Sequence, residues 1–461
     1  MRINSTVSIC PICLKRVEAD VIRQETDSLL KVEFFMEKRC DEHGVFSTVI
    51  WRGNEPSYEG WARGYKLRNE NPNCPFDCGL CLKHQQKTCC ALVGVTHNCN
   101  LCCPICFNGD SKAPDPTLAE LGNTFKGLSE LGNTFVQISG GEPTVRNDLP
   151  EIIAAARAAG CDTIQLNSNG IRLGAEPEFT KALKKAGLSF VFMQFDGTND
   201  EIYNILRGAP LLDAKSEAIR ICGENQIGVT LVPTIVPGVN DHNIGDIIEF
   251  GLKNSPDVRG VHFQPVSYFG RYPKEPTNED RITLPEILHA IEAQTEQKFN
   301  MSDFVPSSCD HPRCGFHGDF VVLPKLDVMK LTKKSTSSCC DDADDYNYTD
   351  CCDDVGCCDD SSDNTGCCDD SDAHIKNRNF VARRWKRTDN LRDDVYDEDA
   401  DYQDMTIFLS RVKTHGFTIT AMAFQDAYNL DIDRLGRCSL HVANGDKIVP
   451  FCARYLTEAR Y

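Results

Sequence analysis

The middle of the chain alternates short apolar runs with amphipathic stretches of helical period, which is the pattern of repeated strand–helix units. Strands are predicted at residues 91–96, 135–139, 163–167, 190–196, 229–236 and 260–266. Helical stretches accompany them, for example at residues 149–159, 177–186 and 284–293. Six such units predict an α/β fold whose parallel sheet, with right-handed crossovers, is open or curled into a partial (β/α)6 barrel. Active sites of such sheets lie at the carboxyl ends of the strands.

The segments on either side of this region follow other patterns. Residues 1–65 read as a small β-rich unit, and residues 66–90 as a cysteine-rich connector to the strand–helix region at 91–300. Residues 301–461 are predicted to form a C-terminal domain, with an acidic, low-complexity insert at 335–404. The tetrapeptide Cys-Cys-Asp-Asp occurs four times in that insert. Sequence so rich in aspartate and poor in apolar residues predicts a solvated segment without a core, with metal scavenging as the alternative.

Charge and hydropathy exclude several classes of protein. The chain has 461 residues and a net charge of −19, but 13 aspartates and no lysine or arginine lie between Cys339 and Asp372. Without those 13 charges the net charge is about −6, and the acidity argues against nucleic acid as a partner. No apolar run is long enough to span a bilayer, and the N-terminus lacks the apolar core of a signal peptide. We therefore expect a cytoplasmic protein.

The 26 cysteines favour metal binding over disulfides, because disulfide frameworks belong to small secreted chains. Cys10, Cys13, Cys40 and His43 have the C-x2-C and C-x2-H spacing of a mononuclear tetrahedral site. Ligand types do not distinguish iron from zinc in such a site. Its expected role is structural.

A second cysteine group directly follows the first predicted strand of the strand–helix region. Cys99, Cys103 and Cys106 form C-x3-C-x2-C, and Cys103 is preferred over its neighbour Cys102 because it preserves that spacing. Three thiolates can hold three irons of a 4Fe–4S cluster and leave the fourth iron open to a small molecule. A zinc site, or three ligands of a four-cysteine cluster, are the alternatives.

The segment 96–107 that contains these cysteines resembles the signature of the radical S-adenosylmethionine (SAM) superfamily. That superfamily has a glycine-rich segment after the next strand, where this chain has Ser139, Gly140, Gly141 and Glu142. Two glycines let the backbone approach a ligand, and Glu142 can accept a hydrogen bond from the α-ammonium group of methionine. Taken alone, the same residues could form an ordinary turn before a helix.

The resemblance implies that a reduced 4Fe–4S cluster cleaves SAM to a 5′-deoxyadenosyl radical, which removes hydrogen from unactivated carbon. It also implies a low-potential electron donor such as ferredoxin or flavodoxin. Polar residues at further strand ends complete the predicted cofactor site, although helix capping and loop chemistry are alternatives for them. These residues are Asn167, Ser168, Asn169, Asp196 and Gln264.

The flanking cysteines narrow the resemblance to archaeal-type radical proteins that include tetraether lipid synthase, some of which are assigned as methyltransferases of a reduced hydroxymethylpterin. The segments that carry it are 74–89, 308–316, 424–431, 437–441 and 450–452. The resemblance implies one auxiliary 4Fe–4S cluster on Cys74, Cys78, Cys81 and Cys89. It implies a second on Cys309, Cys314, Cys438 and Cys452. A zinc knuckle is the alternative for the first set, and Cys90 competes with Cys89 as a ligand.

Three functions remain in competition at this stage. The leading hypothesis is radical coupling of isoprenoid lipid chains, which would add peripheral membrane contact and needs an apolar tunnel. Its candidate lining, which could equally be ordinary core, is Phe316, Phe320, Val321, Val322, Phe408 and Phe417. The second hypothesis is methylation of a reduced hydroxymethylpterin, a small-molecule substrate that needs polar groups instead. The third is an iron–sulfur electron carrier or metal-storage protein, which has no use for residues 139–142.

Overall fold

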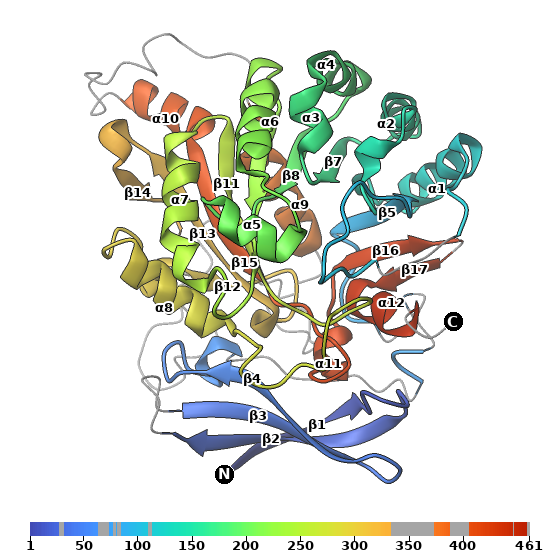
Figure 1. Ribbon diagram of the computed structural model, residues 1–461, viewed down its shortest axis with the longest axis vertical. Coiled ribbons are helices and arrows are strands. Elements are labelled where there is room, and N and C mark those ends of the chain that lie inside the picture. The colour runs from blue at the N-terminus through green and yellow to red at the C-terminus, as the bar shows by residue number, and fades with distance from the viewer. Residues whose placement is uncertain are drawn as a thin grey trace, which may run out of the picture.

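The computed structural model describes residues 1–26, 32–62, 73–76, 80, 84–108, 113–332, 373–387, 405–445 and 447–458. These residues form two sheets, a four-stranded N-terminal sheet and a 13-stranded mixed sheet with helices packed along it (Figure 1). In the part of the chain so described, no helix is both long and apolar enough to cross a membrane.

The N-terminal sheet is an antiparallel meander at the bottom of the molecule in Figure 1. Its strands are β1 (Arg2–Ile9), β2 (Arg16–Glu25), β3 (Val32–Cys40) and β4 (Gly44–Arg52). In β3 buried residues alternate with partly or fully exposed ones, because successive side chains of a strand point to opposite faces. Two contacts fasten the unit to the C-terminal region: Thr6 Oγ1 donates to Asp431 at 2.8 Å, and Lys38 Nζ donates to the carbonyl of Ala427 at 2.8 Å.

Six parallel strands form the centre of the large sheet, as the hydrophobic pattern predicts. In spatial order they are β5 (Cys90–Thr96), β6 (Phe135–Gly140), β7 (Thr163–Ser168), β8 (Phe190–Gln194), β9 (Gly228–Val232) and β11 (Val258–Pro265). The fifth predicted strand breaks at Pro233, which has no backbone N–H, and continues as β10 (Thr234–Ile235). The confirmed fold class is therefore an α/β sheet with its carboxyl strand ends at one edge.

Helices cover the outer side of these strands (Figure 1). They are α1 (Leu118–Glu130), α2 (Leu149–Ala158), α3 (Ile171–Ala175), α4 (Pro177–Ala186), α5 (Asp200–Arg207), α6 (Leu212–Glu224), α7 (Ile244–Lys253) and α8 (Leu284–Gln294). Short 3-10 helices occur at η1 (Gly60–Ala62), η2 (Pro143–Val145), η3 (Asp241–Asn243), η4 (Met301–Asp303), η5 (Pro312–Cys314) and η6 (Pro324–Leu326).

The strands that the structure describes in the C-terminal third extend both edges of the central sheet. β15 (Gly416–Met422) pairs in parallel with β11, and β13 (Gly315–Val322) pairs with β15. At the other edge β16 (Leu440–Asn444) pairs in parallel with β5. The remaining elements are β12 (Val305–Pro306), β14 (Val328–Lys330), β17 (Lys447–Pro450), α10 (Met405–Thr414), α11 (Ile432–Leu435) and α12 (Phe451–Glu458). Unpaired edge strands favour such additions, but a local pattern cannot say which segment pairs with which edge.

Helix α9 (Ala373–Trp385) corrects the prediction that residues 335–404 are a solvated insert throughout. Val381 and Trp385, one helical turn apart, are both buried. The indole N–H of Trp385 donates to Thr418 Oγ1 at 2.8 Å, and Arg259 Nε donates to the carbonyl of Arg384 at 2.9 Å. The composition averaged over residues 335–404 does not reveal an apolar stripe as short as the one on α9. The four Cys-Cys-Asp-Asp units lie outside the described residues.

Candidate active site

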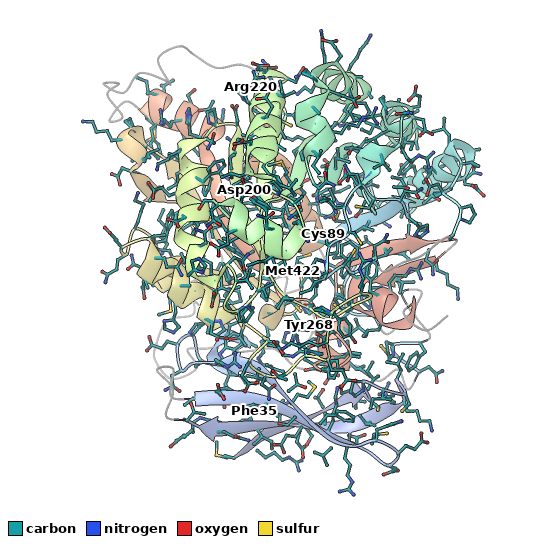
Figure 2. All side chains as sticks on the ribbon, in the orientation of Figure 1. Phe35, Cys89, Asp200, Arg220, Tyr268 and Met422 are labelled. Atoms are coloured by element: carbon teal, nitrogen blue, oxygen red, sulfur yellow. The ribbon has the colours of Figure 1, made fainter. Side chains whose placement is uncertain are left out.

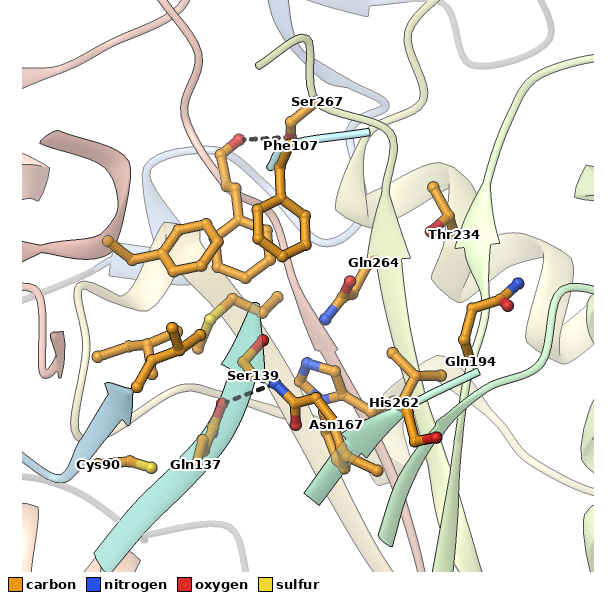
Figure 3. A pocket seen from close by; sticks show the side chains of 18 of the residues that line it. Cys90, Phe107, Gln137, Ser139, Asn167, Gln194, Thr234, His262, Gln264 and Ser267 are labelled. Carbon is orange, nitrogen blue, oxygen red and sulfur yellow. Dashed lines mark hydrogen bonds between the residues drawn. The ribbon is translucent and has the colours of Figure 1, made fainter. Parts of the chain in front are cut away.

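A cavity of about 340 Å³ lies between the inner face of the central strands, the loop after β5, helix α9 and the C-terminal strands. Cys89 and Met422, which both line it, lie in the middle of the molecule in Figure 2. In the close-up, Ser139 of β6, Asn167 of β7, and His262 and Gln264 of β11 converge on its centre (Figure 3). Its volume is in the range of small-molecule sites.

The cysteine loop after β5 forms one wall of this cavity. Cys99, Cys103 and Cys106 line the cavity, whereas Cys102 is exposed and does not. Reciprocal backbone hydrogen bonds of 2.9 Å between Cys106 and Arg271 fix the end of the loop. Three thiols gathered on one short loop at a cavity are a donor set that fits a 4Fe–4S cluster with one open iron.

The glycine-rich segment after β6 is joined to the start of the cysteine loop. The N–H groups of Gly141 and Glu142 donate to the carbonyls of Thr96 and Asn98, each at 2.8 Å. A Cβ on Gly140, whose φ is +136°, would lie 2.2 Å from the Thr96 oxygen, and one on Gly141 would lie 2.1 Å from the Asn98 oxygen. Only glycine permits this close packing of two backbone segments, and both glycines line the cavity together with the three thiols.

Glu142 lines the cavity, but donors of the protein already occupy its carboxylate. Oε1 accepts from the N–H and hydroxyl of Thr144 at 3.1 and 2.6 Å and from Ser168 Oγ at 2.8 Å. Oε2 accepts from the N–H of Asn169 at 2.6 Å. Glu142 is 2% exposed, so the structure assigns it to joining the ends of β6 and β7. Ser168 and Asn169, predicted for cofactor binding, line the cavity at this junction.

Asp196 is placed behind the cavity, while its ion-pair partner Arg207 lines it. The guanidinium donates two hydrogen bonds of 2.7 Å to the Asp196 carboxylate, which is fully buried. Burial alone would lower the pKa of Arg207, but the charge of Asp196 raises it, so Arg207 stays positively charged beside Cys103. The sequence pattern did not identify Arg207, because its place at the end of α5 is that of an ordinary helix-terminal charge.

Lys215 of α6 is also fully buried beneath this part of the cavity. Its ammonium group donates to the carbonyl of Asn169 at 2.5 Å and to Gln194 Oε1 at 2.9 Å. Desolvation lowers the pKa of Lys215 to about 7. Lys215 was not predicted from the sequence. The pattern that could have identified it is a lysine on the buried face of an amphipathic helix.

Amide side chains line the inner face of the central strands. The amides that line the cavity are Gln137, Asn167, Gln194 and Gln264. Of these, only Asn167 and Gln264 were predicted from the sequence. The signal for the other two was polar residues at alternate positions of otherwise apolar strands. Asn167 Oδ1 accepts from Gln165 Nε2 at 2.7 Å, whereas its Nδ2 donates to Gln137 Oε1 only at 3.4 Å, a long bond that a ligand acceptor could replace.

His262, between these amides, is expected to make stability depend on pH. Desolvation lowers its pKa to about 4 from 6.5, so it is neutral in the folded protein at neutral pH. Between about pH 6.5 and pH 4, this histidine is protonated in the unfolded chain but stays neutral in the folded chain. Its contribution to stability is therefore present above 6.5 and lost as pH falls through 4, by up to about 3 kcal/mol. His262→Gln should make the unfolding free energy depend less on pH across this window than it does in the unaltered protein, as measured by denaturant titrations at several pH values.

The predicted auxiliary ligands that the structure describes are Cys74, Cys89, Cys309, Cys314, Cys438 and Cys452. Cys89 lines the cavity, accepts from Asn377 Nδ2 at 3.3 Å and is hydrogen-bonded to the thiol of Cys309. This contact joins one member of each predicted ligand set. Cys314 accepts from Arg434 at 3.4 Å, and Cys452 accepts from the N–H of Gln425 at 3.3 Å. Cys74 is buried and Cys438 is partly buried, and Cys78 and Cys81 lie outside the described residues.

The N-terminal sheet brings Cys10, Cys13, Cys40 and His43 together, with ligand atoms within 4.8 Å of one another. The Cys13 and Cys40 sulfurs are 3.8 Å apart, and His43 Nδ1 is 3.5 Å from the Cys40 sulfur. Three thiols and one imidazole at these separations fit a mononuclear tetrahedral metal.

Cys13→Ala is expected to remove about one equivalent of this metal per chain and to leave cluster iron unchanged. Elemental analysis of purified protein would measure both quantities. Cys161→Ala is the control, because Cys161 is a buried thiol just after α2 and belongs to no predicted ligand set. If Cys13→Ala lost cluster iron together with the metal of the N-terminal sheet, the two kinds of site would not be independent.

Comparisons with known proteins agree with this geometry. A family model described as the radical SAM superfamily matches residues 93–251, and one described as an HMPTM N-terminal zinc ribbon domain matches residues 2–52. A 7,8-dihydro-6-hydroxymethylpterin dimethyltransferase from Methanocaldococcus jannaschii is 34% identical over 97% of this chain and 92% of its own length. A GTP 3′,8-cyclase from Alkaliphilus oremlandii is 31% identical over 43% of this chain and 62% of its own length.

Among solved structures, SuiB of Streptococcus suis bound to S-adenosylmethionine is 14% identical, with a TM-score of 0.38 over 46% of this chain and 49% of that chain. Methylornithine synthase is 17% identical, with a TM-score of 0.35 over 46% of this chain and 64% of that chain.

Proposed function

The chain belongs to the radical SAM superfamily and to the same family as the M. jannaschii pterin dimethyltransferase, and from this we propose that it methylates a reduced hydroxymethylpterin. The observation that carries the proposal is 34% identity along 97% of the chain, which includes the zinc ribbon and the C-terminal strands. This finding favours the methyltransferase over lipid coupling, the leading hypothesis from the sequence.

The residues present fit the cofactors of the superfamily. Cys99, Cys103 and Cys106 would hold the 4Fe–4S cluster, and Gly140 and Gly141, which line the same cavity, would contact the methionine part of SAM. When bound, these groups supply a 5′-deoxyadenosyl radical that removes hydrogen from unactivated carbon. Arg207 would offer its charge to the methionine carboxylate, with Asp196 holding the guanidinium in place.

The walls of the cavity support a polar, planar substrate. Amide groups and a neutral imidazole project from the strands toward its centre (Figure 3). Buried amides need partners, and a ligand with alternating donors and acceptors supplies them where a hydrocarbon does not. The predicted lipid-tunnel residues do not line this cavity; Phe316, Phe320 and Phe417 belong to the main hydrophobic core.

Lipid-chain coupling stays as a second candidate because one end of the cavity is apolar. Phe107, Phe269, Phe424 and Phe451 gather there, with the rings of Phe424 and Phe451 stacked at 4.4 Å. Such an end could receive a saturated chain as well as the edge of a cofactor.

The test compares substrates on anaerobically reconstituted protein with SAM and a strong chemical reductant. We expect 5′-deoxyadenosine to rise when 7,8-dihydro-6-hydroxymethylpterin is added, together with a pterin that has gained methyl groups in its mass spectrum. An increase with an archaeal diether lipid and none with the pterin would replace the proposal by the second candidate. A low-potential donor such as ferredoxin or flavodoxin stays the prediction for the physiological reductant.

A further inference from the structure

The cavity continues inward from the cysteine loop to a region that holds one predicted cofactor residue, Asn167. Gln137, Asn167, Phe192, His262 and Trp385 line this region, which we call the deep end. Four of them come from central strands, and Trp385 comes from α9. In Figure 3 the deep end extends from Asn167 and His262 toward Gln137 and Cys90, away from Phe107.

Two walls of the deep end are aromatic. The rings of Phe192 and Trp385 are 5.0 Å apart, and those of Phe192 and His262 are also 5.0 Å apart. The hydrogen bond from the Trp385 indole to Thr418 fixes the orientation of the largest ring. Rings held in this way offer flat apolar surface against which a planar ring packs at little cost in side-chain entropy.

The edges of the deep end are polar. The hydrogen bond from Asn167 Nδ2 to Gln137 Oε1 is long, at 3.4 Å. Asn167 Oδ1 also accepts from Gln165 at 2.7 Å, and Gln137 contacts the thiol of Cys90. His262 binds Thr420 through Nδ1 at 2.8 Å, which leaves Nε2 for a ligand. Donor and acceptor groups beside flat aromatic walls match a fused nitrogen heterocycle whose edge carries both kinds of group.

Helix α9 closes the deep end and is itself firmly held. Arg378 donates to the carbonyls of Thr88 and Cys89 at 3.0 and 3.3 Å, and Arg384 is ion-paired with Asp319. Asn377 and Val381 of the same helix also line the cavity. Helix α9, which carries Trp385, is therefore part of the same folded unit as the central sheet.

We propose that the deep end is the substrate subsite, that it takes the planar heterocycle of a reduced pterin, and that Trp385 is a specificity-determining residue. This inference rests on the proposed function for the identity of the ligand. The adenosine of SAM, also a planar heterocycle, is assigned to the outer part of the cavity beside Cys106 and Gln264.

The experiment measures equilibrium binding of 7,8-dihydro-6-hydroxymethylpterin and of SAM to reconstituted holoprotein by anaerobic calorimetry. Trp385→Leu and Gln137→Leu should each raise the Kd for the pterin at least about tenfold and change that for SAM less than about twofold. Trp385→Phe, which keeps an aromatic face, should restore most of the pterin affinity. Phe380→Leu is the matched control, since Phe380 lies on α9 and does not line the cavity.

Unchanged pterin affinity in both Trp385→Leu and Gln137→Leu would overturn the inference, and so would displacement of the pterin by saturating SAM. Measuring the methylated product distinguishes failure of this inference from failure of the proposed function. Methylated pterin formed with a normal KM by both variants refutes the subsite alone. If the variants weaken binding of the pterin but the unaltered protein forms no methylated product, the subsite is supported and the proposed methyltransferase function is refuted.

Discussion

Cys103→Ala is expected to lower 5′-deoxyadenosine formation at least about a thousandfold, because loss of one of three thiolates leaves the cluster without its site. The neighbouring Cys102→Ala is the matched control, and it should retain activity within about twofold. The two residues differ only in where the loop directs them. Cys103 lines the cavity beside Arg207, whereas Cys102 is exposed.

The measurement is anaerobic turnover with SAM and reductant, with iron and sulfide content determined on the same samples. Cys103→Ala should lose the iron of one cluster, while Cys102→Ala keeps all of it. If Cys102→Ala were the inactive variant, the ligand spacing would be C-x2-C-x3-C and the assignment of the loop would be wrong.

Gly141→Ala is expected to lower both the stability of the protein and its rate of SAM cleavage. The new Cβ would lie 2.1 Å from the backbone oxygen of Asn98, and backbone atoms cannot move aside as a flexible side chain does. The glycine-rich segment and the cysteine loop must then separate, which breaks the hydrogen bond from Glu142 N to Asn98. We expect a loss of about 1–3 kcal/mol in unfolding free energy and at least about a hundredfold in SAM cleavage.

Gly94→Ala provides the control for this change. Gly94 lies on β5 close to the same loop, but a Cβ there meets no atom within 4 Å, and its φ is not in the left-handed region. The free energy of unfolding and the rate of SAM cleavage should therefore stay near those of the unaltered protein. Equal damage from both substitutions would show that strand propensity, and not the close approach at Gly141, explains the loss.

Properties that depend on neighbouring residues could be predicted from the sequence alone. Strand positions follow from apolar runs, and the six central strands lie where the pattern places them. The three cysteines of the loop reach the cavity together because their spacing keeps them on one short segment. The close approach at Gly140 and Gly141 likewise uses backbone freedom that the residue type itself confers.

Other parts of the site depend on contacts between segments far apart in the chain. Asp196 was selected as a ligand contact, yet folding places Arg207 at the cavity and Asp196 behind it. Trp385 comes from a segment whose composition predicts no core, and its neighbour Arg384 is held by Arg259, 125 residues away.

The same division explains both the confirmed fold and the corrected architecture. The sequence by itself determined the repeated strands, the cysteine loop and the metal-binding turns, because periodicity and spacing act over a few residues. Only the tertiary structure decided that β15 and β16 join opposite edges of the sheet and that α9 closes the cavity. These pairings depend on burial and hydrogen bonds between segments far apart in the chain. Such contacts leave no pattern in the local sequence.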